Sequence, residues 1–152
     1  MKKIVISFTL LAFLLGTGIC FAESGIPNLV GTWTVQTEGA VMFKGSVPAT
    51  GSMHGGEVAD FKADGSIKQV SRQSKVVVTA QQGRVLHGTF TSEKATENFI
   101  MVIGWGNKTV HLADHDGFID GNIVNKDKIN FIYRHVSSDD TVVLTGTWTR
   151  KK

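Results

Sequence analysis

Apolar and polar residues alternate along most of the chain, in short runs that are separated by turn residues. Each run holds five to ten residues rich in Val, Ile, Thr and aromatic side chains, and each break carries Gly, Asn, Asp or Ser. Alternation with a period of two places successive side chains on opposite faces of a β-strand. The pattern therefore predicts eight strands in a meander, at 32–37, 75–80, 84–91, 98–105, 109–113, 118–124, 129–136 and 141–150.

A short sequence, Gly-Thr-Trp-Thr, occurs at both ends of this meander, at 31–34 and again at 146–149. Pairing of the first strand with the last would close the sheet and remove both of its edges. We therefore predict an all-β fold, an eight-stranded antiparallel up-and-down barrel. Barrels of this size either hold one small ligand or are filled by their own side chains.

The segment from about 40 to 73 departs from the strand pattern. Residues 44–56 are rich in Gly and Ser and predict a loop, while 57–63 and 66–72 flank Asp64-Gly65 and predict a polar hairpin. We expect an insertion between the first two barrel strands. Connections of this length are commonly functional lids or mobile arms; the alternative is a tolerated surface hairpin.

Residues 1–22 predict an export signal, which leaves 23–152 as a single barrel domain. A basic start precedes an apolar run at 4–20, and the small residue Ala22 follows. We expect a periplasmic or secreted protein with no stable membrane anchor after signal removal. An uncleaved anchor and a lipid attached to Cys20 are the alternatives.

The composition narrows the classes of function. Cys20 is the only cysteine and lies in the signal, so the mature chain excludes a thiol nucleophile and a thiolate metal site. Removing Lys2 and Lys3 from the 16 basic residues leaves 14, against 13 acidic residues. The remaining cations are scattered, apart from Arg150-Lys151-Lys152. A nucleic-acid surface needs a basic patch with stacking aromatics, so we expect no nucleic-acid partner.

Several strand sequences resemble, in order, those of the avidin and streptavidin family, whose barrel is close in shape to that of the lipocalins. Gly31-Thr32-Trp33 resembles the family's opening Gly-Thr-Trp, and the run at 88–92 resembles its Gly-Thr-Tyr-x-Ser. Trp105-Gly106-Asn107 resembles its Trp-Lys-Asn, 128–130 its Arg-Ile-Asn, and 146–150 its closing Asp-Thr-Phe-Thr-Lys. The resemblance implies an avidin-like or lipocalin-like barrel with a hydrophobic cup.

The biotin site of that family transfers poorly to this chain. The family holds the ureido ring of biotin with an Asn and a Ser on strand one, a Tyr and a Ser on strand three, and an Asp near the end. The matching positions here are Val35, Gly39, Phe90, Ser92 and Gly146. Each lost hydrogen bond would cost about 1–3 kcal/mol. We therefore expect biotin to bind weakly or not at all.

Strand parity and the family match together predict the lining of the cup. If Trp33 faces inward, alternate residues of every strand do so too, and the resemblance adds Trp105 and Tyr133 as aromatic walls. Trp33 and Trp148 are expected at the barrel floor. The candidate ligand-binding residues are Val35, Thr37, Phe90, Ser92, Met101, Trp105, Phe131, Tyr133 and His135. A mostly apolar lining with a few polar points is typical of a small-molecule site.

The densest polar cluster comprises His111, Asp114, His115 and Asp116. Imidazole and carboxylate groups at this spacing could hold a divalent ion. Asp-His-Asp-Gly is equally a good turn, because Asp accepts backbone N–H bonds and Gly tolerates positive φ. We predict the turn and no metal.

Candidate catalytic groups are few. No serine stands in a nucleophile elbow. Tyr133 and His135 share one side of a strand and form a candidate acid–base pair; the alternative is a Tyr and a His at a solvated rim. We expect no catalytic residues and no cofactor.

The sequence thus favours an exported, non-catalytic barrel for a small apolar or amphiphilic ligand. The alternatives are a barrel-cavity isomerase or cyclase, and a protein-binding barrel such as a secreted protease inhibitor. In the latter, the 40–73 arm and residues 23–29 would carry the contact.

The predicted strand at 98–105 is apolar on both faces. Ile100 and Val102 point opposite to Phe99, Met101, Ile103 and Trp105. One of the two sets must face outward, and an apolar outer face needs cover. We expect either a homo-oligomer through this face or a cover formed by the inserted hairpin.

Overall fold

The computed structural model describes residues 25–43, 58–60, 67–92, 95–138 and 140–152. These residues form nine strands, and none of them belongs to a helix that could span a bilayer. The strands are β1 (Gly31–Phe43), β2 (Val58–Asp60), β3 (Ile67–Gln82), β4 (Val85–Thr91), β5 (Thr96–Ile103), β6 (Thr109–Ala113), β7 (Gly117–Asn125), β8 (Lys128–Val136) and β9 (Asp140–Arg150). The predicted export signal lies outside the described residues and stays a prediction.

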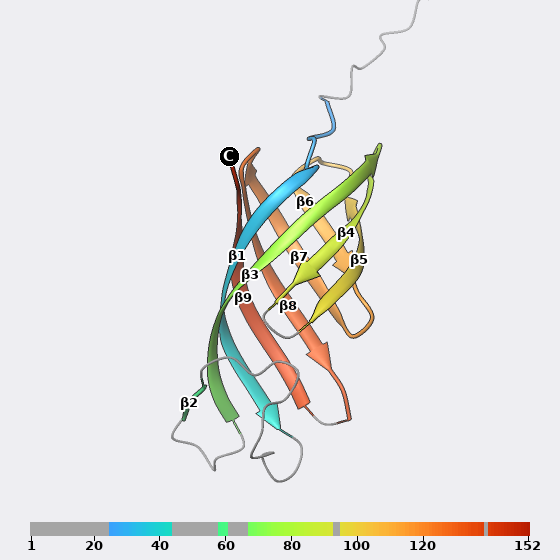
Figure 1. Ribbon diagram of the computed structural model, residues 1–152. Coiled ribbons are helices and arrows are strands. Elements are labelled where there is room, and N and C mark those ends of the chain that lie inside the picture. Colours follow the sequence, from blue (N-terminus) through green and yellow to red (C-terminus); the bar gives the residue numbers. More distant parts are fainter. Residues whose placement is uncertain (1–24, 44–57, 61–66, 93–94, 139) are drawn as a thin grey trace, which may run out of the picture.

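Eight of these strands close into an antiparallel barrel, as the alternation predicted (Figure 1). The order around the barrel is β1-β9-β8-β7-β6-β5-β4-β3, and β3 returns to pair with β1. Val35 is opposite Trp148, and Trp33 is opposite Arg150. The expected pairing of the two strands that carry Gly-Thr-Trp-Thr is therefore confirmed, and the barrel has no open seam.

The insertion between the first two barrel strands is shorter than the predicted segment 40–73, because both ends of that segment belong to barrel strands. β1 and β3 pair without a break from Gly31 opposite Val78 to Met42 opposite Ile67. The ends of these strands therefore belong to the barrel wall, and with β9 they reach past the shorter strands β4, β5 and β6 (Figure 1). Polar residues and glycine along this stretch concealed its alternation, because only Val41 and Val70 mark the inner face strongly.

The expected polar hairpin is present in a modified form. β2 pairs antiparallel with the start of β3, with Val58 opposite Val70 and Asp60 opposite Lys68. Its second strand is thus a barrel strand rather than a separate element. The predicted loop at 44–56 and the turn at Asp64-Gly65 lie outside the described residues.

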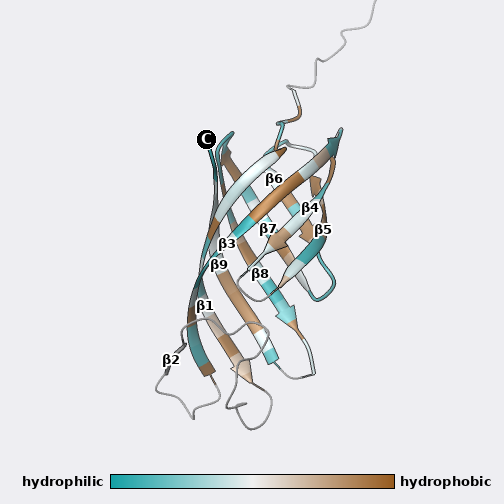
Figure 2. Ribbon diagram, viewed as in Figure 1, coloured by the Kyte–Doolittle hydropathy of each residue, from teal (hydrophilic) through white to brown (hydrophobic). Residues whose placement is uncertain are grey.

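Apolar side chains fill the interior in two clusters. Figure 2 shows hydrophobic and hydrophilic positions alternating along the strands, as inward and outward parity requires. The larger cluster comprises Leu29, Trp33, Val35, Val76, Val78, Leu86, Phe99, Met101, Ile103, Val110, Leu112, Ile119, Ile129, Phe131 and Trp148. The smaller cluster comprises Val41, Val70, Val142 and Leu144. The ring centroid of Trp148 lies 6.1–6.3 Å from those of Trp33, Phe99 and Phe131, so aromatic packing dominates the larger cluster.

The segment before β1 closes the barrel at the end that holds Trp33. Leu29 is fully buried, and its carbonyl accepts a hydrogen bond of 3.1 Å from the Trp33 indole. The Arg150 guanidinium lies 4.2 Å from the centroid of the Trp33 ring. It also donates to the backbone carbonyls of Val30 and Asn28, at 2.7 and 2.9 Å. Arg150 thereby joins the last strand to the segment that covers the barrel floor.

Replacing Arg150 with Met should destabilise the fold by about 2 kcal/mol, because several hydrogen bonds and a cation–π contact are lost together. Arg134→Met is the matched control. Arg134 is 55% exposed and pairs only with Asp120 among the described residues, so this variant should lose about 1 kcal/mol or less. Chemical denaturation of both variants measures the difference. Equal losses would contradict the role given to Arg150.

Candidate functional site

The opposite end of the barrel carries a concentration of polar side chains. The β4–β5, β6–β7 and β8–β9 connections all lie here, and the Trp33 floor is at the far end. A cavity of about 80 Å³ opens at this end. It is lined by Thr37, Arg72, Ser74, Phe90, Ser92, Ala95, Glu97, Phe99, Leu112, Asp114, Ile119, Phe131, Tyr133 and Leu144.

The structure brings five of the nine predicted ligand-binding residues to this cavity: Thr37, Phe90, Ser92, Phe131 and Tyr133. Val35 and Met101 also face inward, but they lie deeper and are at most 1% exposed. Both belong to the packed cluster around Trp148. They form part of the solid closed half and do not line the cavity.

The inward placement expected for Trp105 is wrong. Its side chain is 86% exposed and stands outside the barrel at the closed end, with the Arg84 guanidinium 4.9 Å from its ring centroid. β5 ends at Ile103, and a turn follows in which Asn107 adopts a φ of +57°. Strand parity no longer applies to a residue in that turn, so counting along the strand placed Trp105 on the wrong side.

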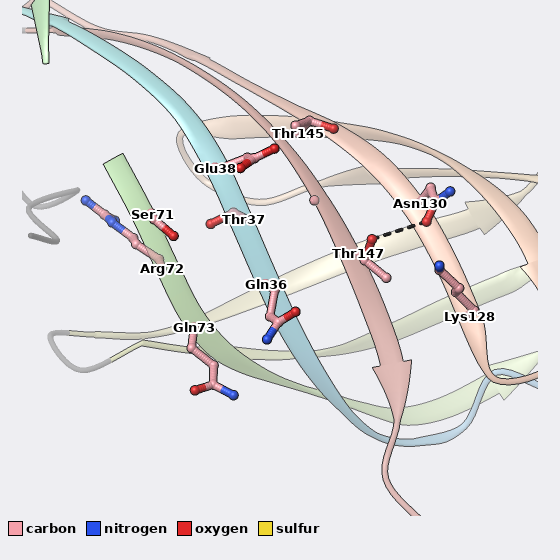
Figure 3. A pocket seen from close by; sticks show the side chains of 11 residues that line it. Gln36, Thr37, Glu38, Ser71, Arg72, Gln73, Lys128, Asn130, Thr145 and Thr147 are labelled. Atoms are coloured by element: carbon pink, nitrogen blue, oxygen red, sulfur yellow. Dashed lines mark hydrogen bonds between the residues drawn. The ribbon is translucent and has the colours of Figure 1, made fainter. Parts of the chain in front are cut away.

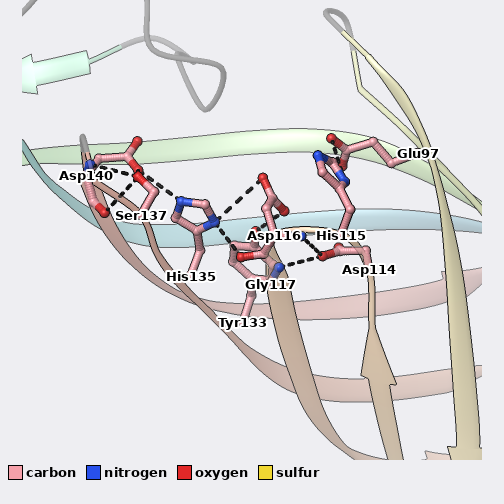
Figure 4. Close-up of polar contacts among 9 residues, drawn as sticks. All are labelled: Glu97, Asp114, His115, Asp116, Gly117, Tyr133, His135, Ser137 and Asp140. Carbon is pink, nitrogen blue, oxygen red and sulfur yellow. Dashed lines mark hydrogen bonds and ion pairs between the residues drawn. The ribbon is translucent and has the colours of Figure 1, made fainter.

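His135 is buried behind the cavity and links two turns (Figure 4). Its Nδ1 lies 2.6 Å from the backbone carbonyl of Asp116, and its Nε2 lies 3.0 Å from the Asp140 carboxylate. The Asp140 carboxylate also accepts a hydrogen bond of 2.8 Å from the Ser137 hydroxyl. Both ring nitrogens therefore serve structural contacts.

Tyr133 lies between this network and the cavity. Its hydroxyl donates to the Asp116 carboxylate at 3.3 Å. Burial, and secondly the negative charges of Asp116 and Asp114, raise the pKa of Tyr133 above its ordinary value. The phenol therefore stays protonated and acts as a hydrogen-bond donor. Because His135 does not line the cavity, the candidate acid–base pair does not converge on open volume.

The Asp-His-Asp-Gly sequence forms the turn that was predicted. The Asp114 carboxylate accepts hydrogen bonds from the backbone N–H groups of Gly117 and Asp116, at 2.6 and 3.2 Å. His111 is separate from this turn, on the outer surface, and contacts Asp120 at 2.8 Å. The four residues first considered as metal ligands are therefore not assembled in one place.

A different set of possible metal ligands meets at the mouth. Atoms of Glu97, His115 and Asp116 lie within 4.8 Å of one another. Glu97 comes from β5, where it shares the inward parity of Phe99, and parity could have identified it. The Glu97 and His115 side chains are 3.8 Å apart. Carboxylate and imidazole donors of this kind suit a divalent ion, although an ion pair accounts equally well for their proximity.

The mouth of the cavity carries charges of both signs. Glu97, Asp114 and Asp116 form its negative wall, and Arg72 forms its positive wall. Burial, and then the charge of Asp116, raise the pKa of Glu97, and burial also raises the pKa of Asp114. On β3, burial lowers the pKa of Arg72, while Tyr133 and Asp140 oppose that change. Arg72 was missed in the sequence because residues 66–72 were assigned to a surface hairpin.

A second, wider depression lies on the outer surface of β3, β1, β9 and β8 (Figure 3). It has a volume of about 740 Å³ and is lined by Gln36, Thr37, Glu38, Ser71, Arg72, Gln73, Lys128, Asn130, Thr145, Gly146 and Thr147. Its lining is polar and includes no aromatic side chain on which a ligand could stack. We therefore locate the candidate site in the cavity at the open end.

Comparison with known proteins assigns no family and no function to this chain. No family model and no curated protein matches the chain. A solved structure described as a redesigned β-barrel is similar, with 15% sequence identity and a TM-score of 0.43. The match covers 90% of this chain and 100% of that chain. The closed barrel described here rests on the strand pairing of the chain itself.

Glu97→Gln should raise the free energy of unfolding near neutral pH. Because the pKa of Glu97 is raised on folding from 4.5, the folded state binds its proton more tightly than the unfolded chain does. Ionisation therefore costs stability as the pH rises above that value. The gain from the substitution should disappear on acidification to about pH 3.5, where the carboxyl is protonated in both states. Denaturation at the two pH values tests this.

The control for this substitution is Glu38→Gln, at an exposed position of β1. A surface substitution of this kind should change stability by about 0.5 kcal/mol or less. A gain for Glu97→Gln that persists unchanged in acid would show that it does not come from the charge.

Proposed function

We propose that this protein is an exported, non-catalytic barrel, acting in the periplasm or outside the cell, that binds a small apolar or amphiphilic molecule at its open end. The observation that carries the proposal is the cavity itself. Phe90, Phe99 and Phe131 supply apolar walls, and polar groups such as Thr37 and Tyr133 stand at the mouth. An apolar pocket with a few convergent polar groups is the usual form of a small-molecule site.

The size of the cavity limits the ligand. Sites for drug-sized molecules are about 300–1,000 Å³, whereas this cavity has about 80 Å³. Below it, Val35 and Met101 are packed tightly. The ligand is therefore a small molecule, or one that inserts a short apolar group and leaves the remainder at the mouth.

An avidin-like affinity for biotin is not part of the proposal. The family's Asp near the end would fall at Gly146. A Cβ atom built there would meet the Phe131 ring and would lie 2.7 Å from the Gln36 carbonyl oxygen. Phe131 thus occupies the space that a carboxylate side chain would need. This crowding supports the expectation that biotin binds weakly or not at all.

The proposed site is tested with 1-hexanol as an apolar probe and biotin as a negative control. Tyr133 is the only tyrosine in the chain and lines the cavity, so its ring NMR signal reports occupancy. Hexanol should shift this signal in a saturable way, and biotin should not. Ser74→Phe fills the cavity from β3 and should weaken hexanol binding about tenfold or more, since steric exclusion removes the apolar contacts.

Ser71→Phe is the matched control, because Ser71 is an exposed residue of the same strand. It should bind hexanol as the wild type does. Thermal unfolding confirms that both variants are folded. A hexanol response that survives in Ser74→Phe, or is absent from the wild type, would contradict binding in this cavity.

We also propose that the protein self-associates through the outer face of β5. Ile100 is 67% exposed, Val102 is 44% exposed, and Phe118 on β7 is 63% exposed. Together they line a surface depression of about 400 Å³. β2 lies on β3 and is separated from β5 by β3 and β4. The described part of the hairpin therefore does not cover this face.

The double variant Ile100→Lys, Val102→Lys should be monomeric, because exposed aliphatic side chains each forgo roughly 1.5–3 kcal/mol of burial. The control Val143→Lys changes an exposed position on β9 and should leave association intact. Sedimentation at high protein concentration measures both. A wild-type chain that sediments as a monomer would rule out this interface.

A further inference from the structure

Arg72 has unmet hydrogen-bonding capacity at the wall of the cavity. Alternation along β3 places Arg72 on the inner face of the barrel, together with Val70, Ser74 and Val76. Val70 and Val76 are almost fully buried. The Nε and Nη2 atoms of Arg72 are buried, and neither has a hydrogen-bond partner among the described residues. A buried charged donor without an acceptor is costly, so this arrangement calls for an acceptor from outside the described structure.

The two unpaired atoms also define the shape of that acceptor. Nε–H and Nη2–H point in parallel from one edge of the planar guanidinium, and this fork matches the two oxygens of a carboxylate. Tyr133, whose hydroxyl is a donor, lines the same cavity. Phe90, Phe99 and Phe131 line it as well and would surround an apolar body attached to the carboxylate.

The negative wall of the mouth narrows the class of ligand further. Glu97 and Asp114 line the cavity, and Asp116 lies beside them at the mouth. None of the three is among the groups that influence the pKa of Arg72 besides its burial, which are Tyr133 and Asp140. A ligand with one anionic group can meet Arg72 and keep its apolar body in the cavity. A second negative charge would face the carboxylates on the other wall, so a dianion is disfavoured.

We propose that Arg72 binds the carboxylate of a small, singly charged apolar acid through its Nε and Nη2 atoms. This inference rests on the proposed function and specifies its ligand class. The acid is short, since the cavity has only about 80 Å³, and its apolar portion lies among the three phenylalanine rings. The interaction is a charge-assisted, two-point hydrogen bond made in a partly dehydrated site.

The test compares hexanoate, 1-hexanol and hexylamine, which share one alkyl chain and differ in head group. Isothermal titration and the Tyr133 ring signal measure binding to the full chain. Hexanoate should bind about ten- to a hundredfold more tightly than hexanol, in keeping with hydrogen bonds to a charged group. Hexylamine should bind no more tightly than hexanol. Tighter binding of hexylamine, or equal binding of hexanoate and hexanol, would overturn the inference.

Arg72→Gln and Lys75→Gln form a matched pair, because both remove one positive charge from β3 and Lys75 is exposed. Arg72→Gln should reduce hexanoate affinity to that of hexanol, and Lys75→Gln should leave it unchanged. Equal losses in both variants would show a general charge effect and overturn the proposal. Without ligand, Arg72→Gln should unfold at the same temperature as the wild type or higher, since it removes two buried donor atoms that have no partner among the described residues.

The outcomes separate this inference from the proposed function. Hexanol binding in both the wild type and Arg72→Gln, with no preference for hexanoate, would retain the binding barrel and reject the role of Arg72. Failure of both hexanol and hexanoate to bind the wild type would reject the two together. The Arg72 Nε–H resonance gives an independent reading, because bound hexanoate should shift it and hexanol should not.

Discussion

Closure of the sheet constrains the rest of this molecule. β1 pairs with β9 along one edge and with β3 along the other, so each of its residues has a register fixed by two neighbours. A slip of one residue in either ladder would turn the inner set of side chains outward. From Trp33 to Val41 the inner positions therefore stay inside along the whole of β1. The space that these side chains leave unfilled determines where a ligand can lie.

The two ends of the barrel leave unequal space. At the closed end, Trp33 and Trp148 fill the interior, and Arg150 joins the covering segment to the last strand. Towards the other end, Thr37 on β1 and Ser74 on the adjacent strand β3 contribute small side chains to the cavity wall. The cavity is thus a consequence of residue size along strands whose direction and register are already fixed.

Much of the fold followed from the sequence because alternation is a local signal. The order of the strands and the pairing of the two Gly-Thr-Trp-Thr segments needed no knowledge of distant contacts. Predictions from local alternation were wrong where a strand ends or where polar residues conceal the alternation. Trp105 stands in a turn beyond the end of β5. Arg72 lies within a polar run that looked like a surface hairpin, and only its pairing with β1, opposite Thr37, places it on the inner face.

The polar groups at the open end differ in what they do for the fold. Asp114 accepts two backbone hydrogen bonds within its turn, and His135 bridges Asp116 and Asp140. These side chains hold the loops at the mouth, although His and Asp are the residue types that suggest catalysis in a bare sequence. Arg72 is the contrasting case, because its two buried nitrogens have no partner among the described residues. Buried donors in that state cost stability, and a carboxylate bound in the cavity, as proposed, would satisfy both of them at once.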